Sequence, residues 1–172
     1  VLELTEAEHR FEFHGLAERP VPSLLRDFSA PVRVQYPWSR EQLLFLMSHD
    51  PDGFNRWDAG QRLAVDVIQS LVGTPEQAEV EPRLADAYRK LLNDASLDQA
   101  LVAKMLLLPS EAYLVELAEQ ADVPAIHAAR ERVLKHLAEE LKDDLLACYR
   151  RNRQQGDYQL GPDAIARRSL CN

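Results

Sequence analysis

The chain has 172 residues, of which 46% are hydrophobic and 28% charged, a composition typical of a globular protein with a real core. Its formal net charge of −8 argues against a nucleic-acid partner, because phosphate binding needs a surplus of Lys and Arg on one face. No apolar run approaches the roughly 18 residues of a membrane span, so no membrane partner is expected.

The two ends of the sequence and its cysteines suggest a context. The N-terminus has no basic stretch ahead of an apolar one and predicts no signal peptide. The sequence starts without Met inside a strand-like pattern and ends without a stop signal, so we expect a piece of a longer protein. Cys148 and Cys171 are far apart and have no metal-ligand spacing, which fits a reducing compartment.

Residues 1–37 predict short β-strands. Apolar and polar residues alternate over residues 1–5, 10–14 and 31–36, and this alternation is typical of half-buried strands. A strand at residues 23–25 would start after Pro22 or lie at an edge, since proline removes a ladder donor. Three or four short strands cannot form a stable sheet alone. We therefore expect residues 1–37 to be the last strands of an antiparallel β-sandwich that needs partners from upstream chain.

From Ser39 onward the apolar spacing changes to three and four residues, which indicates helices. Ser39 and Gln42 form a capping box that starts the first helix, and this helix should end near Asp50. A longer helix runs to about Leu71. Either Asp52 or Asn55 is placed to cap its start, and Gly73 can end it in a left-handed turn.

One apolar face of this long helix is the feature around which the chain is organised. Its members are Trp57, Gly60, Ala64, Ile68 and Leu71. Trp57 would bring the largest apolar surface to the core, and Gly60 would let another backbone approach closely. The sequence therefore predicts the first wall of a helical layer here.

Five further helices are expected. The first spans residues 82–93, and the second opens with a capping box at residues 96–99 and is stopped by Pro109. A short helix runs from Ser110 to about residue 120, and the longest one runs from Asp122 to about residue 151. The last helix starts at Gly161. The longest carries a stripe stepping by four, made of Ala129, Val133, Leu137, Leu141, Leu145 and Tyr149.

Antiparallel helices joined by short turns predict a mainly α fold, an α-α layered array of the solenoid kind, preceded by the few strands. No fixed-period repeat is present, so a regular repeat protein is not expected. The basic runs at residues 150–153 and 167–168 lie at helix ends or between helices, where cations complement the helix dipole.

Few residues suggest chemistry. His127 and Glu131, and again His136 and Glu140, are four apart on the longest helix, but no third metal ligand is nearby, so exposed His–Glu contacts are the better interpretation. The sequence has no His-Glu-x-x-His pair, nucleophile elbow or glycine-rich phosphate loop. Residues 50–53 lack the later oxygens of a calcium loop and predict a turn with a helix cap. We predict no catalytic, cofactor-binding or metal-binding residue in this segment.

Phrases spread along nearly the whole chain resemble, in the same order, the C-terminal half of bacterial aminopeptidase N, a zinc metallo-aminopeptidase of the gluzincin group. They lie at residues 1–6, 20–32, 54–61, 107–111 and 165–170. The resemblance implies that residues 1–37 end a small β-sandwich domain and that residues 38–172 begin an α-helical C-terminal domain.

The resemblance also implies a function. The zinc ligands, the general base and the transition-state tyrosine would lie upstream, so no such residue is assigned here, and whether the segment itself has activity stays open. The helical part would cap the active-site chamber and admit peptides rather than folded proteins, in a cytoplasmic enzyme in which zinc-bound water attacks the first peptide bond. Its partners would be the upstream catalytic and β-sandwich domains and peptide substrates.

A second hypothesis is a free-standing α-solenoid scaffold that binds a partner along a groove. Such a scaffold would more commonly begin with a polar capping helix, whereas this sequence begins with a strand pattern. The N-terminal pattern therefore favours the aminopeptidase segment.

Overall fold

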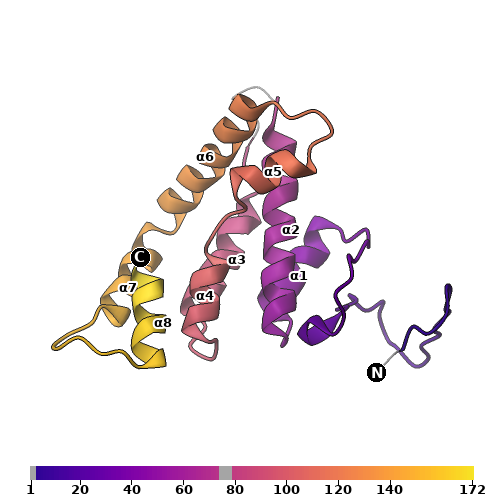
Figure 1. The fold of residues 1–172 in the computed structure, drawn as a ribbon, viewed down its shortest axis with the longest axis horizontal. Helices are drawn as coiled ribbons and strands as arrows, with labels where there is room; N and C mark the ends of the chain where they lie inside the picture. The colour runs from indigo at the N-terminus through magenta and orange to yellow at the C-terminus, as the bar shows by residue number, and fades with distance from the viewer. Residues whose placement is uncertain (1–2, 74–78) are drawn as a thin grey trace.

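The computed structural model describes residues 3–73 and 79–172, and all the regular secondary structure of these residues is helical (Figure 1). A short 3₁₀ helix, η1, comes first and eight α-helices follow. Their bounds are η1 Arg26–Phe28, α1 Arg40–His49, α2 Gly53–Leu71, α3 Pro82–Asn93, α4 Gln99–Met105, α5 Glu111–Leu117, α6 Val123–Glu140, α7 Lys142–Asn152 and α8 Pro162–Cys171. The predicted mainly α array is confirmed. None of the described helices is long and apolar enough to cross a membrane.

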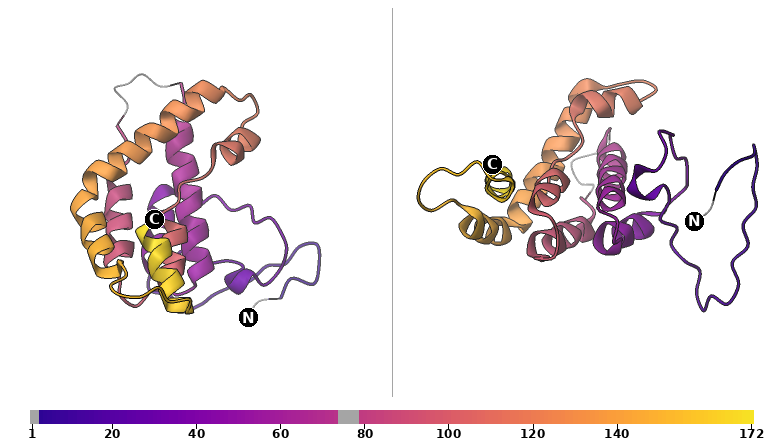
Figure 2. Two further views of the ribbon diagram at one scale, coloured as in Figure 1. Left: turned by 60° about the vertical axis from the view of Figure 1, so that its left-hand side comes forward. Right: turned by 60° about the horizontal axis from the view of Figure 1, so that its bottom comes forward.

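Helix α2 lies at the centre of the array and contacts η1, α1, α4 and α6. Helix α3 contacts α1, α6 and α7, while α8 packs on α4 and α7. Figure 2 shows α6 and α7 running along one side of the array, with the N-terminal segment extending away on the other. The helices thus form layers around α2, and α2 presents one face to the core and another to the N-terminal segment.

The N-terminal segment differs from the sequence expectation in its secondary structure. Residues 3–37 contain η1 and otherwise coil, and no residue of this stretch is in a strand; Val1 and Leu2 of the first expected strand lie outside the described residues. The physical reason is that these segments are too few to form a sheet by themselves. An extended segment without neighbouring strands cannot form the hydrogen bonds of a β-ladder.

Most helix starts follow the predicted local chemistry. Ser39 and Gln42 form the expected capping box at α1, and Asp52 rather than Asn55 caps α2, its side chain accepting from the Asn55 N–H. Ser110 caps α5 and Asp122 caps α6 in the same way. Beyond the end of α2, Gly73 has a φ of +72°, the left-handed conformation that glycine adopts without steric cost.

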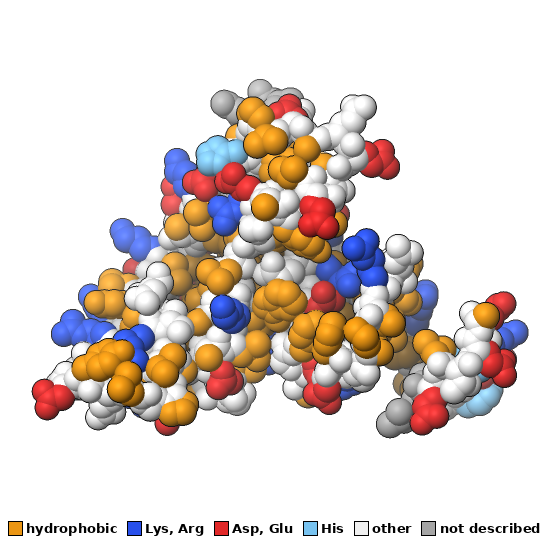
Figure 3. Space-filling model, in the orientation of Figure 1, with side chains coloured by type: hydrophobic (Ala, Val, Ile, Leu, Met, Phe, Trp, Pro, Cys, Tyr) orange, Lys and Arg blue, Asp and Glu red, His pale blue; other side chains and the backbone are white. Residues whose placement is uncertain are grey.

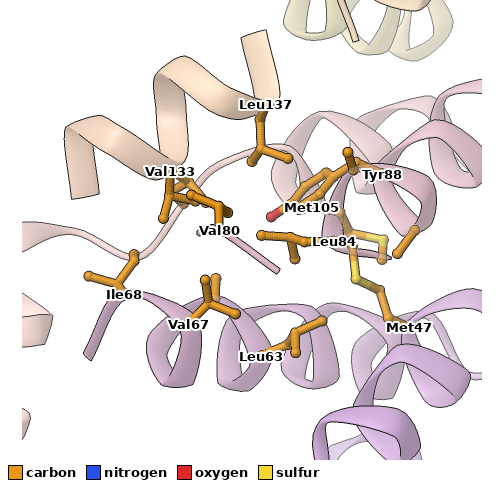
Figure 4. Packing of buried hydrophobic residues seen from close by; sticks show 14 of the residues in the cluster. Met47, Leu63, Val67, Ile68, Val80, Leu84, Tyr88, Met105, Val133 and Leu137 are labelled. Carbon is orange, nitrogen blue, oxygen red and sulfur yellow. The ribbon is translucent and has the colours of Figure 1, made fainter. Parts of the chain in front are cut away.

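The core lies between α2, α3 and α6 and is filled by aliphatic side chains around Tyr88 (Figure 4). Leu63 and Ile68 are fully buried, and each contributes about 1.5–3 kcal/mol by leaving water. Trp57 is half-buried and packs against the margin of this cluster, so it buries less of its apolar surface than its position on this face suggested. Gly60 faces the Met47 side chain rather than another backbone: a Cβ added at this position would lie 3.5–3.7 Å from Met47 atoms.

Helix α4 differs from its prediction at both ends. Asp98, not Ser96, caps it: the Asp98 carboxylate accepts from the Leu101 N–H, while Ser96 bonds to Asp94. The helix ends at Met105, four residues before Pro109. Pro109 restricts only Leu108 directly, so it does not explain an end at Met105.

The predicted longest helix is two helices with a bend at Leu141, whose φ and ψ are −105° and 9°. At the bend the Arg89 guanidinium donates to the Glu140 carbonyl at 3.0 Å and to the Asp144 carboxylate at 3.1 Å. A side chain that bonds a carbonyl inside the helical ladder is a known cause of kinks. The bend redirects the apolar stripe, so Cys148 is buried while Leu145 and Tyr149 are exposed.

Candidate functional site

A groove of about 1090 Å³ runs between three segments of the described chain. Its walls come from three segments that are distant in sequence: the extended residues 33–37, one face of α2, and the stretch from the end of α4 through α5. On the face drawn in Figure 3, apolar, basic and acidic side chains gather where these segments meet. This mixture is typical of a binding surface rather than of a core.

The floor of the groove is the polar face of α2. Asp58, Gln61, Arg62, Asp66 and Gln69 line it, and their three- and four-residue spacing places them on one side of the helix. The opposite side of α2 is buried. The same helix therefore supplies the central core packing and the base of the groove.

Arg62 joins the floor to the N-terminal wall. Its Nε donates to the Asp58 carboxylate at 2.6 Å, and its Nη2 donates to the Val34 carbonyl at 3.4 Å. The guanidinium also lies over the Trp38 ring, 5.1 Å from the ring centroid, which is a cation–π contact. These three contacts hold the extended segment beside α2.

The other wall is held by α6. Arg130 of α6 donates to the Pro109 carbonyl at 2.9 Å, and His127 Nδ1 lies 2.8 Å from Glu111 Oε1. The hydrogen bond to Glu111, with that carboxylate's negative charge, raises the pKa of His127 above the usual 6.5. On the α2 side, Gln61 Nε2 donates to the Leu107 carbonyl at 2.8 Å, which closes the wall onto the floor.

Two cations face the groove without a hydrogen bond or ion pair to any described residue. These are Arg33 on the N-terminal wall and Lys104 at the end of α4. The apolar walls include Tyr113 and Leu117, which are 46% and 42% exposed. Such a groove can bind an extended, partly apolar chain, and the hydrogen bond that the Ser110 hydroxyl makes among the described residues is a helix cap, accepted from the Tyr113 N–H.

The histidine pairs considered in the sequence do not converge on a metal site. His127 contacts Glu111 rather than Glu131, so the predicted i,i+4 contact is wrong, because Glu111 of the neighbouring helix lies closer and Glu131 pairs with Arg130. The half-buried His136 has no hydrogen-bond partner for its Nε2 among the described residues. No group of three His, Cys, Asp or Glu side chains within residues 3–73 and 79–172 could hold a metal ion. The side chains present here do not fit a zinc ion.

The groove was missed by the sequence analysis. A signal for it existed in the second, polar stripe of α2, which carries both charges and two glutamines at helical spacing. Its other walls could not be found this way, because residues 33–37 and 104–117 reach α2 only through tertiary packing.

Comparison with known proteins identifies the class. A family model described as a domain of unknown function (DUF3458_C) with ARM repeats matches residues 40–172, and a model described as a domain of unknown function (DUF3458) with an Ig-like fold matches residues 1–37. The chain belongs to the ARM-repeat family, since that match covers most of its length. ARM repeats are a class of helical repeats. A regular repeat protein was not expected from the sequence, because the sequence has no fixed period.

The chain is homologous to the C-terminal region of bacterial aminopeptidase N. It is 42% identical to aminopeptidase N of Escherichia coli (strain K12) and 39% identical to that of Haemophilus influenzae, each over 100% of this chain and 20% of the relative. The crystal structure of Legionella pneumophila aminopeptidase A in complex with aspartic acid matches 94% of this chain and 20% of that one, with a TM-score of 0.81 and 32% identity. The chain thus spans 20% of the length of these curated relatives.

Proposed function

We propose that this chain is a non-catalytic segment of a zinc-dependent aminopeptidase that removes N-terminal amino acids from peptides. The observation that carries the proposal is the 42% identity to aminopeptidase N over the whole of this chain. In this proposal the zinc, and the water that it activates, belong to another part of the longer chain, as the resemblance to aminopeptidase N implies.

We further propose that residues 1–37 end a β-sandwich domain and that residues 38–172 begin the helical C-terminal domain. The two family models support this division, since one ends at residue 37 and the other starts at residue 40. The upstream catalytic and β-sandwich domains are then the partners of this segment. The two free thiols, Cys148 and Cys171, fit a cytoplasmic location for the enzyme.

The helical part covers the active-site chamber and limits which substrates enter it. The groove supports this role, because its exposed apolar and cationic side chains suit contact with extended peptides. Tyr113 and Leu117 would form part of the wall that a long peptide passes, whereas a single amino-acid amide would not reach them.

The first test compares hydrolysis of an alanyl chromogenic amide by this chain and by the full-length protein that carries it, each with and without added zinc. Activity in the full-length protein alone, lost with a chelator, is the expected result. Activity in the 172-residue chain itself would overturn the proposal. Inactivity of both would favour a free-standing helical scaffold that binds a partner along the groove.

The access role is tested in the full-length protein with Cys171→Ser as background. A bulky maleimide attached at Tyr113→Cys should slow hydrolysis of long peptides and leave hydrolysis of the alanyl amide unchanged. The same label at Lys90→Cys, an exposed position on α3 outside the groove, is the matched control. Equal effects of the two labels, or no effect of either, would contradict the access role.

A further inference from the structure

The two basic runs of the sequence, at residues 150–153 and 167–168, meet at one polar pocket between the end of α7 and α8. The pocket has a volume of about 420 Å³. Three arginines, Arg151, Arg153 and Arg167, and three glutamines, Gln154, Gln155 and Gln159, line it. Figure 3 shows basic side chains gathered on the side of the molecule where Figure 1 places α7 and α8.

The charge of this end is opposite to that of the rest of the chain. Residues 148–172 hold five Arg and two Asp and therefore carry +3, so the remaining residues must carry −11 to give the total of −8. A local excess of positive charge on an acidic protein attracts anions to that end.

Helix-dipole complementation does not account for the whole cluster. Arg151 lies in the last turn of α7, where the dipole favours a cation. Arg153 lies beyond that helix, and Arg167 comes before the last turn of α8. The side chains of Arg153 and Arg167 also make no hydrogen bond or ion pair to any described residue, so both guanidinium groups are available to a ligand.

The loop between the two helices is folded around Arg168. Its Nη1 donates to the Gln159 carbonyl at 2.8 Å and to Gln154 Oε1 at 3.2 Å, and the guanidinium lies over the Tyr158 ring at 4.5 Å. Arg151 is fixed separately, since its Nη2 donates to the Leu92 carbonyl at 3.0 Å. These contacts hold the loop and Arg151 in place before any ligand arrives, which lowers the entropic cost of binding, while the Arg153 and Arg167 side chains are ordered by the ligand itself.

We propose that this pocket binds a small oxyanion with at least two charged oxygens, carried by phosphate or carboxylate groups. The planar guanidinium donors match both groups, and the volume lies in the range of small-molecule sites. Asp163 also lines the pocket, and its negative charge repels any anion there. Binding therefore depends on a ligand that engages both free arginines at once. This site is independent of the proposed peptidase role.

The test is titration of this protein with inorganic phosphate, pyrophosphate and citrate, followed by calorimetry and by NMR shifts of the arginine side chains. Pyrophosphate should bind with a Kd below about 1 mM at low salt and more weakly as salt screens the charges. Tighter binding of pyrophosphate than citrate identifies phosphate as the recognised group, and the reverse order identifies carboxylate.

Substitutions locate the binding. Arg153→Gln and Arg167→Gln should each weaken binding by about tenfold, the loss expected for one charge-assisted hydrogen bond. Asp163→Asn should tighten phosphate binding by about threefold, which guards against loss of affinity through misfolding. The double variant Arg19→Gln/Arg33→Gln removes two positive charges far from the pocket, twice the loss in either single variant, and should still leave the affinity within about twofold.

Three results would overturn the proposal. One is the absence of binding for all three probes up to about 10 mM. Another is an equal loss in the Arg19/Arg33 control, which would mean non-specific attraction. The last is binding of an acidic peptide without binding of any small anion, which would make this surface a protein-docking patch. None of these readouts depends on peptidase activity.

Discussion

Asn55, in the first turn of α2, reaches across to Ser23: its Nδ2 donates to Ser23 Oγ at 2.8 Å and to the Leu24 carbonyl at 2.9 Å. Next to it, the Asp27 N–H donates to Asp52 Oδ2 at 2.9 Å. Within this turn Leu25, Asp27 and Phe28 have φ values of 49–56°, which cost about 1 kcal/mol or more for residues with side chains. The start of α2 therefore holds a strained turn of the N-terminal segment against the helices.

Asn55→Ala should lower the free energy of unfolding by about 2–3 kcal/mol, because the substitution removes two part-buried hydrogen bonds and releases the strained turn. Urea denaturation followed by circular dichroism measures the loss. Asn93→Ala is the matched control: its amide also donates twice, to the Arg89 carbonyl and the Asp144 carboxylate, but the side chain is exposed. We expect the control to lose less than about 1 kcal/mol. Equal losses would mean that the turn is not held by Asn55.

Leu63→Ala should destabilise the protein more than Trp57→Ala does. Leu63 is fully buried at the centre of the core, so its truncation leaves a cavity and costs about 3–4 kcal/mol. Trp57 is half-buried, so its truncation should cost about 1.5–2.5 kcal/mol despite the larger side chain. Denaturation midpoints and slopes of the two variants give the comparison. A larger loss of stability for Trp57→Ala than for Leu63→Ala would indicate that the tryptophan ring is buried in the core.

Helix starts could be predicted because their causes are local. The capping side chains Ser39, Ser110 and Asp122 each lie three residues before the N–H that they accept from. The start of α4 shows the limit of this reasoning. Ser96 and Asp98 are two candidate caps only two residues apart, and the sequence pattern selected Ser96, whereas Asp98 caps the helix. The half-burial of Trp57 could not be predicted from the pattern either. Helical spacing shows which residues share a face, but it does not show how deeply each residue of that face is buried.

The bend at Leu141 could not be predicted, because its cause is distant in sequence. Arg89 lies on α3, 51 residues before the Glu140 carbonyl that it bonds. The same holds for the groove and the arginine pocket, whose walls come from separate helices. The strand pattern in residues 1–37 is a different case: the alternation is present, but the strands that would complete a sheet are not among the described residues.

The bend at Leu141 leads to a prediction that distinguishes the apolar stripe expected from the sequence, which includes Leu145, from the face that is buried in the structure, which includes Cys148. Cys148→Gln should cost about 3 kcal/mol or more, because a larger polar side chain enters a site that is 3% exposed. Leu145→Gln should cost less than about 1 kcal/mol, since Leu145 is 37% exposed and both residues favour helix. Chemical denaturation of the two variants decides the matter. The opposite order would indicate a straight helix through Leu141.

The contact between His127 and Glu111 makes the docking of α5 on α6 sensitive to pH. Glu111 raises the folded-state pKa of His127 above the usual 6.5, so the stabilisation is complete below that value and is lost as pH rises through the raised pKa. An NMR titration of the His127 imidazole measures the folded pKa directly. Glu111→Gln should lower this pKa clearly, whereas Glu131→Gln should lower it less, because Glu131 acts on His127 by charge without the hydrogen bond. Unchanged titration of His127 in Glu111→Gln would show that the two side chains do not meet in solution.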